Sequence, residues 1–450
     1  MSASATDVTH DLIVIGAGPA GMAAAAKAAA LGLKTVLLDE QVRPGGQIYR
    51  NVAGCDARVA ALLGPDYTHG AGLVRALQSS GAELLDNTLV WDVARDLTVT
   101  ALHAGRAFQL RAPQVIAATG AMERASPIPG WTLPGVMNAG AAQIAMKSGG
   151  AVPAGRIVLA GAGPLLLLVA CQLLEAGADV AALVETAPAG RRFEALRHLP
   201  AALRAWPALA KGLKMVRSLR RARVPWYTQA SDLAAIGRDH VEALAFRAGG
   251  REHRVDTDCL LLHHGVIPDT QLSRLLRLEH RWDDRQLAWQ VVTDDLGQTS
   301  LDGLRMVGDG TAIAGARAAE ASGALAALGA AHALGRIDAA ALAQRSAALR
   351  RTLATELAIR PFLDVLYRPP RSITEPADAT IVCRCEEVTA KQVRDTAAEL
   401  LNIYARRAAR LVREHQRQQP DQGRRDRDQA DHRQQREVDA RRCRHFGGAR

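Results

Sequence analysis

The sequence has few aromatic residues and few cysteines, and it lacks an apolar run long enough to cross a membrane. Phe, Trp and Tyr make up 4% of the 450 residues, so we expect a core of Ala, Leu and Val. Six cysteines are too few for a disulfide scaffold at this length. The longest apolar run, 157–170, is shorter than the ~20 residues of a membrane span. Residues 1–10 show no apolar segment of a signal peptide, so we expect a cytoplasmic protein.

Positive charge is concentrated at one end of the chain. The formal net charge is +10, and residues 401–450 hold 14 Arg, no Lys and seven acidic residues. This tail therefore carries +7 and leaves +3 for the first 400 residues. Its Arg, Gln and Asp residues cannot build a core, so we expect a disordered tail. Because the tail lacks interleaved aromatic residues, we expect no nucleic-acid binding.

The first motif is a strand, a glycine-rich turn and a helix. Residues 11–15 (DLIVI) are typical of a buried parallel strand, and the Ala-rich residues 22–31 favour a helix. Between them, GAGPAG has the G-x-G-x-x-G spacing of a dinucleotide-binding turn, in which the glycines allow a tight turn, close approach to a pyrophosphate, and helix–strand packing. The predicted site residues are Gly16, Gly18, Pro19, Ala20 and Gly21. The free N–H groups of the helix N-terminus would face the phosphates.

The strand that follows ends in two carboxylates. Residues 35–38 predict a second strand, and Asp39 and Glu40 come directly after it. Asp39 stands where an acidic side chain would bind a ribose hydroxyl. The whole unit thus predicts a dinucleotide site more strongly than the glycines alone.

A second unit begins at Ile157 and repeats the design. Gly161 and Gly163 keep the first two glycine positions, and Glu185 closes the second strand. Leu166 replaces the third glycine, which we expect to push the helix away from the strand. The acid favours NAD over NADP, although two arginines nearby blur that preference. Two interpretations stay open, a functional NAD(H) site and a unit that no longer binds a nucleotide.

Two later segments return to the first unit. Residues 115–121 (VIAATGA) predict a strand that ends at Thr119 and Gly120. Residues 306–310 (MVGDG) predict a strand that ends at Gly308 and Asp309, before a long Ala-rich helix. The Pro-Gly pairs of residues 127–135 are typical of turns in a linker between the two units.

These motifs together resemble a known family. GxGxxG, ATG, a second GxG and a late GD are similar to the two-dinucleotide-domain flavoproteins of the disulfide-reductase type. DEQVRPGGQIYR (39–50), PIPGWTLPGV, AGAGPLLLL and CRCEEVT (383–389) further resemble the α-type flavoprotein subunits of heteromeric amine dehydrogenases. That family includes the A subunit of opine oxidase, the B subunit of hydrogen cyanide synthase and subunits of hydroxyproline dehydrogenase. The resemblance covers roughly residues 8–400.

The resemblance implies an α/β fold with two Rossmann-like dinucleotide-binding domains, a C-terminal segment and a disordered basic tail. It implies FAD across the first domain, with Gly46 and Gln47 in the loop toward the flavin ring. Thr119 and Gly120 would flank the pyrophosphate, and Asp309 would bind the ribityl chain or a phosphate. The implied domains are an FAD-binding domain (1–125 and 266–345), an NAD-binding-like domain (126–265) with a basic helical insertion (187–224), a linker with a partial BFD-like [2Fe–2S] segment (346–400), and the tail (401–450).

The insertion is strongly basic and has apolar residues at helical spacing. Residues 191–223 hold ten Arg or Lys and one acidic residue, Glu194. Leucines, Trp206 and Val216 recur on one predicted face, and Pro207 divides the segment into two amphipathic helices. Three interpretations stay open. They are a solvated basic face over a buried apolar stripe, a docking surface for a partner subunit, and contact with a membrane surface.

The cysteines and histidines point away from disulfide and metal chemistry. Cys55, Cys171 and Cys259 stand alone, so we expect no dithiol relay. His263 and His264 end an apolar strand with no further ligand pattern, so we expect no metal there. In the family, a pair such as Cys383 and Cys385 supplies half the ligands of a [2Fe–2S] cluster. Such a cluster needs four thiolates, and this chain offers only Cys443 beyond that pair. We therefore expect no stable cluster in the chain as written.

The resemblance implies an FAD-dependent oxidoreductase subunit, the α subunit of a heteromeric opine or amino-acid (secondary amine) dehydrogenase that handles electron transfer. Its implied partners are a flavoprotein β subunit of the DAO type and a small ferredoxin-like subunit. Two alternatives stay open. One is a stand-alone NAD(P)H-dependent flavin reductase, and the other is a non-catalytic nucleotide-binding assembly subunit. No residue stands out as catalytic in the sequence.

Overall fold

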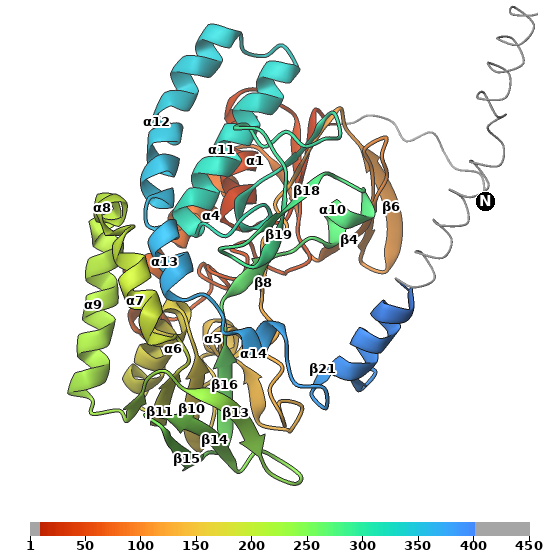
Figure 1. The fold of residues 1–450 in the computed structure, drawn as a ribbon. Coiled ribbons are helices and arrows are strands. Elements are labelled where there is room, and N and C mark those ends of the chain that lie inside the picture. The colour runs from red at the N-terminus through yellow and green to blue at the C-terminus, as the bar shows by residue number, and fades with distance from the viewer. Residues whose placement is uncertain (1–9, 401–450) are drawn as a thin grey trace, which may run out of the picture. The chain divides into compact units, whose positions relative to one another are not determined.

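A computed structural model of the chain describes residues 10–400 (Figure 1). Contacts divide the chain into two units, Met1–Ile381 and Val382–Arg450. The predicted disordered tail and Cys443 lie outside the described residues. No described helix is both long and apolar enough to span a membrane.

The first sheet of the larger unit is parallel, with the strand order β20-β7-β1-β2-β3. The strands β1, β2 and β7 are completely buried, as expected of a parallel sheet covered on both faces. The strand bounds are β1 (Leu12–Ile15), β2 (Thr35–Leu38), β3 (Glu83–Leu85), β7 (Gln114–Ala117) and β20 (Leu304–Met306). β7 ends at residue 117 and β20 begins at residue 304, so the chain returns to its first sheet after almost 190 residues.

Small residues bring two helices together over this sheet. α1 (Pro19–Ala30) packs against α11 (Ala316–Ala333), and the two lie side by side in Figure 1. A Cβ atom on Gly323 would lie 2.0 Å from the backbone oxygen of Ala20, so only glycine permits this approach. Both helices are Ala-rich, which explains how a core with few aromatic residues is close-packed.

Three helices and an antiparallel sheet complete this part of the chain. The helices are α2 (Ala57–Leu63), α3 (Pro65–Thr68) and α4 (Gly70–Gln78). The antiparallel strands are β4 (Thr88–Val93), β5 (Thr98–His103) and β6 (Arg106–Arg111).

The second sheet is also parallel, with the order β12-β11-β10-β16-β9. Its strands are β9 (Val136–Asn138), β10 (Arg156–Gly161), β11 (Asp179–Glu185), β12 (Trp226–Tyr227) and β16 (Cys259–His263). The helices α5 (Ala139–Gly149) and α6 (Pro164–Glu175) follow β9 and β10. An antiparallel sheet of β13 (Ser231–Ile236), β14 (Ala243–Ala248) and β15 (Arg251–Asp256) shares a buried apolar cluster with this sheet.

Two antiparallel strands carry the chain between the sheets. β8 (Ala121–Glu123) leaves the first sheet, and β17 (Val266–Pro268) pairs with it on the way back. α10 (Gln271–Leu275) and the hairpin of β18 (His280–Asp283) and β19 (Ala288–Val291) follow β17.

The basic insertion is helical, and its predicted apolar stripe is only partly buried. It consists of α7 (Ala189–Leu196), α8 (Leu199–Ala202), a 3-10 turn (Leu203–Ala205) and α9 (Trp206–Arg221). Pro207 lies in the first turn of α9, where its missing N–H costs no helical hydrogen bond. The side chains of Leu196, Leu203, Trp206 and Leu213 are exposed. Leu219 is buried, and Val216 and Leu209 pack against apolar clusters. The predicted stripe is therefore divided, with one part covered by the protein and the other part facing solvent.

The larger unit ends with helices α12 (Ala339–Leu357), α13 (Arg360–Leu366) and α14 (Arg371–Thr374). α13 packs against α7 and α8. Strands β21 (Ile381–Cys383) and β22 (Val388–Thr389) form a two-stranded sheet near the start of the smaller unit, and residues 390–400 are helical.

Candidate dinucleotide sites

Each glycine of the first turn is required for a different reason. Gly16 has a φ of +95°, and a Cβ atom there would lie 2.6 Å from the Ala118 oxygen. A Cβ atom on Gly21 would lie 1.8 Å from the Gly16 oxygen, so this glycine lets α1 pack on β1. At Gly18 the Cβ position is open, with the Cα of Gly46 at 4.0 Å as its nearest neighbour. The protein itself thus leaves room beside Gly18, as a bound pyrophosphate requires.

The N-terminus of α1 faces this turn. Gly18 is its N-cap residue and provides no side-chain cap, and Pro19 and Ala20 form the first turn. The first N–H groups of a helix lack partners within the helix, and they carry partial positive charge. The turn and the helix end therefore suit an anionic phosphate group.

Asp39 orders the turn from the end of β2. It is buried, and its two carboxylate oxygens accept hydrogen bonds from the backbone N–H groups of Ala17 and Gln41. Burial raises the pKa of its carboxyl, while the two backbone N–H groups act in the opposite direction. Glu40, the other predicted acid, is exposed and accepts a bond from the Gln41 side chain.

The loop that contains Gly46 and Gln47 lies against the same turn. Gly46 has a φ of +58°, and a Cβ atom there would lie 2.8 Å from the Gly18 Cα atom. The Gln47 backbone oxygen accepts a hydrogen bond from the Nζ atom of Lys147 at 3.1 Å. The Nε atom of Arg50 is buried and has no hydrogen-bond partner within residues 10–400.

Thr119 and Gly120 follow β7 and border the turn. The Thr119 hydroxyl is buried and without a hydrogen-bond partner in the described part of the chain. Such a group normally finds a partner, so an unpaired hydroxyl here suits a ligand with polar oxygens. Gly120 has a φ of +74°, which turns the chain away from the sheet.

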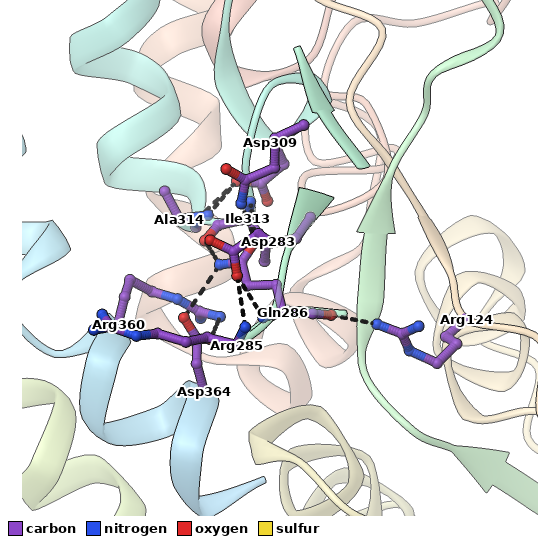
Figure 2. Close-up of polar contacts among 11 residues, drawn as sticks. Arg124, Asp283, Arg285, Gln286, Asp309, Ile313, Ala314, Arg360 and Asp364 are labelled. Carbon is purple, nitrogen blue, oxygen red and sulfur yellow. Dashed lines mark hydrogen bonds and ion pairs between the residues drawn. The ribbon is translucent and has the colours of Figure 1, made fainter. Parts of the chain in front are cut away.

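Gly308 and Asp309 lie after β20, beside the same sheet end. The Oδ1 atom of Asp309 accepts the backbone N–H groups of Ala314 and Gly315 at 2.8 and 2.9 Å (Figure 2). Asp309 thus holds the loop that leads into α11, while no hydrogen bond from the described residues reaches its second carboxylate oxygen. Gly308 donates its N–H to the Ser322 hydroxyl of α11.

Gln286 connects this loop to two other elements, as Figure 2 shows. Its Nε2 atom donates to the Ile313 oxygen at 2.9 Å and to Asp364 of α13 at 3.2 Å, and its Oε1 atom accepts the Ile313 N–H. Its backbone oxygen accepts a hydrogen bond from Arg124, which lies just after β8. Arg360 forms an ion pair with Asp364. The turn between β18 and β19 therefore fixes the loop beside Asp309.

The first site fits a dinucleotide by these structural criteria. The fit rests on the open space at Gly18, the free helix N-terminus and the unpaired Thr119 hydroxyl. The residues predicted for it, from Gly16 through Asp309, all lie at the same end of the first sheet, where β1, β2, β7 and β20 finish. Ligands of open α/β sheets bind at this end.

The second turn differs from the first in its backbone. Gly161 and Gly163 have φ values of +139° and +138°, whereas Gly18 has a φ of −72°. A Cβ atom on Gly163 would lie 3.0 Å from the imidazole of His263, in a position that is open at Gly18. Leu166 occupies the third-glycine position and is buried in α6.

His263 is held in place from the linker. Its Nδ1 atom lies 2.5 Å from the Oε1 atom of Glu123, whose other oxygen accepts the N–H of Gly140 at 2.8 Å. Strand pairing matches His263 with Gly161, as the continuation of the β1–β7 register matches Ala118 with Gly16. An imidazole thus stands in the second unit where the first unit has a methyl group.

His264 is fully buried beside this pair. Its Nδ1 atom lies 2.9 Å from the Ser126 hydroxyl, and its Nε2 atom lies 3.3 Å from the Thr186 hydroxyl. Burial, with charge from His263 and Arg124, lowers its pKa to about 3. His264 is therefore neutral at physiological pH and serves as a packed hydrogen-bonding residue.

Glu185 has a partner of its own. Its carboxylate lies 3.5 Å from Arg192 of α7, and burial raises its pKa despite that cation. Partial burial raises the pKa of the Tyr367 hydroxyl, and the charge of Glu185 nearby raises it further. The acid predicted to bind a nicotinamide-dinucleotide ribose is thus already paired with the chain's own arginine.

The cysteines do not form a dithiol in the described residues. Cys55, Cys171, Cys259, Cys383 and Cys385 are free thiols there. Residues 10–400 contain no group of three or more His, Cys, Asp or Glu that could hold a metal ion. Cys383 ends β21, and Cys385 lies in the turn that follows.

Lys147 is a buried cation that the sequence did not indicate. Its Nζ atom donates to Gln143 at 2.8 Å as well as to the Gln47 oxygen, and Gln143 in turn bonds Gln172 of α6. Burial lowers its pKa to about 7, and the charge of Arg50 acts in the same direction. The lysine lies on α5 among apolar and small residues, and periodicity alone would place an apolar side chain there.

Two parallel sheets, each with a glycine turn at its strand ends, define a two-dinucleotide oxidoreductase fold. The model of the family described as pyridine nucleotide-disulphide oxidoreductase matches residues 10–326, and the chain belongs to this family. The chain is therefore an oxidoreductase, and its fold is one that generally binds the dinucleotides FAD and NAD(P).

The chain is also similar to subunits of known enzymes. The chain is 44% identical over 409 residues to the A subunit of opine oxidase from Agrobacterium tumefaciens (strain Ach5), covering 88% of this chain and 80% of that one. It is 34% identical to the HcnB subunit of hydrogen cyanide synthase from Pseudomonas aeruginosa, covering 84% and 83%. These relatives are subunits of heteromeric enzymes by their names. The predicted membership, and the prediction of an FAD-dependent oxidoreductase subunit, are thereby confirmed.

Solved structures support the fold. L-proline dehydrogenase from P. horikoshii aligns with a TM-score of 0.59 at 18% identity, covering 87% of this chain and 66% of that one. Thioredoxin reductase from T. acidophilum aligns with a TM-score of 0.50 at 17% identity, covering 73% and 99%. The predicted α/β fold with two Rossmann-like domains is confirmed.

Proposed function

We propose that this chain is the FAD-carrying subunit of a heteromeric dehydrogenase that oxidises an opine or a related secondary-amine amino acid. The observation that carries the proposal is the 44% identity with the A subunit of an opine oxidase over most of both chains. The asymmetry of the two sites supports it, because the first turn is open at Gly18 and the second is filled by His263.

FAD would lie across the end of the first sheet. Gly16, Gly18 and the N-terminus of α1 would hold the pyrophosphate, and the Thr119 hydroxyl would gain its missing partner. Asp39 or Glu40 would bind the adenosine ribose, and the free oxygen of Asp309 would bind the ribityl chain or a phosphate. When bound, the flavin would supply the redox chemistry. The protein would contribute binding, orientation and a fixed loop beside Asp309.

The substrate would be oxidised on a partner subunit, and this chain would receive or store electrons. Among residues 10–400 no paired cysteines lie near the first turn, so a dithiol relay has no residues to use. A flavoprotein of the DAO type fits the partner's role, and a small ferredoxin-like subunit would complete the complex. The second unit would have a structural role, with NAD(H) bound weakly or not at all.

Co-expression of the chain with its genomic neighbours, followed by purification and a cofactor inventory, tests the proposal. We expect a second flavoprotein to co-purify, FAD to be stoichiometric in this chain, and an opine to reduce the complex. Rapid bleaching of the flavin in the isolated chain by NADH would instead identify a stand-alone reductase. Flavin that stays oxidised with every donor would identify an assembly subunit.

A further inference from the structure

The basic insertion presents bulky apolar side chains to solvent. Phe193 of α7 is 74% exposed, and Trp206 of α9 is 65% exposed. We call the exposed surface of α7–α9 the basic–apolar face. Its apolar residues are Phe193, Leu196, Leu203, Trp206 and Leu213, each at least half exposed.

Helix geometry places these side chains away from the core. Trp206 and Leu213 are seven residues apart, so they share one side of α9. Met215 and Leu219 lie on the opposite side and are buried in the main apolar cluster. α9 packs against α6 and runs along the left edge of Figure 1. The core already has its own residues from this helix, so the exposed ones are available for another contact.

The charge around these side chains has one sign. Three of the ten basic residues in 191–223 form ion pairs, with Glu194, Glu185 and Asp66 as partners. The other seven make no ion pair within the described residues, and all are exposed: Arg197, Arg204, Lys214, Arg217, Arg220, Arg221 and Arg223. An anionic surface would complement them.

The sign of the charge argues against two occupants. A second copy that docked by the same face would bring the same basic charge, and the chain's own tail carries +7, so neither would complement this face. Exposed Trp, Phe and Leu side chains together with Lys and Arg are instead the residue types of helices that lie in a membrane interface. We propose that the basic–apolar face docks on the surface of an anionic lipid bilayer, with Trp206 and its apolar neighbours inserted at the headgroup level.

An acidic protein is the rival occupant. It would need carboxylates opposite a long, single-signed set of cations, together with pockets for several separate apolar anchors. A bilayer supplies both features without specific geometry, since its anionic headgroups attract each Arg or Lys and its acyl boundary accepts each apolar side chain. Docking of this kind is independent of the proposed redox role.

Sedimentation with lipid vesicles tests the proposal on the full chain. Vesicles of phosphatidylcholine alone are compared with vesicles that also contain phosphatidylglycerol. We expect binding to the anionic vesicles only, weakened by added salt because screening reduces the attraction. The double variant Trp206→Glu, Leu213→Glu should bind roughly tenfold or more weakly. All variants keep the same basic tail, so a difference between them reports the face alone.

Trp91→Glu is the matched control, because Trp91 is 59% exposed on β4 outside the insertion. It should bind like the unmodified chain. If the double variant fails to fold, Arg217→Glu with Arg220→Glu tests the same face through charge. Failure of the anionic vesicles to bind the chain, equal binding by the variants of the face, or an equal loss in the control would overturn the proposal. Loss of a co-purifying subunit in these variants, without any vesicle binding, would also overturn it and assign the face to a protein.

Discussion

The Nδ1 atom of His263 lies 2.5 Å from the Oε1 atom of Glu123, and the ring of the same imidazole lies against Gly163. This pair fills the second turn at a place that stays open in the first. We expect NADH titration to show weak binding or none, even when FAD is stoichiometric. The cause lies in His263 as well as in Leu166, which already breaks the glycine pattern.

Replacement of His263 separates these two causes. His263→Ala copies Ala118 of the first unit, so we expect roughly tenfold or more tighter NADH binding, about 1.4 kcal/mol, measured by fluorescence titration. Leu166→Gly is the comparison variant and restores only the glycine pattern. A tight NADH complex with rapid flavin reduction in the unmodified chain would contradict this prediction and favour the reductase.

Gly18 tests the first site. Gly18→Val should lower FAD affinity on the order of 100-fold, about 2.7 kcal/mol, because its side chain enters the space left for the pyrophosphate. The fold should survive, since the Cβ position meets no protein atom closer than 4.0 Å. FAD content after purification and the thermal unfolding midpoint are the measurements. Gly149→Val is the control, because the Cβ position of Gly149 also faces open space. Full FAD content in the Gly18 variant would show that the cofactor assignment is wrong.

Iron content tests the C-terminal segment. Cys383 and Cys385 offer two thiolates, and Cys443 could add a third across a long segment whose ordering costs conformational entropy. We expect flavin absorbance without cluster bands, and iron well below stoichiometric. Two iron and two sulfide per chain would contradict the prediction, and would mean that another ligand or a second chain completes the cluster.

Lys147 gives a pH-dependent stability. Its pKa falls from an ordinary 10.5 to about 7 on folding. Between pH 7 and pH 10.5 the lysine is therefore mostly protonated in the unfolded chain and mostly neutral in the folded one. The contribution of Lys147 to the free energy of unfolding is therefore lowest below pH 7 and rises up to about pH 10.5. The slope approaches about 1.4 kcal/mol per pH unit within that window.

Chemical denaturation of the Lys147→Met variant across this pH range measures the effect. The difference in stability between the unmodified chain and the variant should rise with pH. Lys34→Met is the control, because it makes the same substitution at an exposed lysine. A difference for Lys147 that does not change with pH would show that the lysine is not desolvated in solution.

Gln286 tests the link between the loop of Asp309 and α13. Gln286→Leu leaves the Ile313 backbone and the Asp364 carboxylate without their shared partner. We expect a loss of about 1–3 kcal/mol in the free energy of unfolding and faster FAD release. Thermal unfolding and stopped-flow dilution measure the two effects, and exposed Gln78→Leu is the control. Unchanged FAD release would mean that the loop holds its shape without this amide.

Backbone patterns in the sequence predicted much of the first unit. The predicted strand at 35–38 matches β2, and the predicted helix at 22–31 overlaps α1, which begins earlier at Pro19. These elements could be predicted because a short apolar run that ends in glycine is typical of a buried strand in a parallel sheet. Gly16 and Gly21 could also be predicted, since a Cβ atom at either position would clash with the backbone nearby, whereas Gly18 was predicted from the room that a pyrophosphate needs.

Polar contacts between residues far apart in the chain could not be predicted from the sequence. Glu123 and His263 are 140 residues apart in the chain, and long-range contacts such as the pairing of β8 with β17 bring their neighbourhoods together. Lys147 lies on a helix whose pattern favours an apolar residue at that position. For the insertion, the sequence left three interpretations open, because the spacing of leucines shows which residues share a face of a helix but not whether that face meets the core.

The late position of β20 in the chain has a consequence for biosynthesis. A ribosome releases β1, β2 and β7 before Leu304, and until then β7 is an unpaired sheet edge and α1 lacks α11 over its small residues. The strands of the second sheet, from Val136 to His263, emerge completely within that interval. A nascent chain halted between His263 and Leu304 thus holds all strands of the second sheet and one open edge in the first, which makes it a natural client for a chaperone. Cofactor loading becomes a late event, set by the emergence of a three-residue strand and the helix behind it.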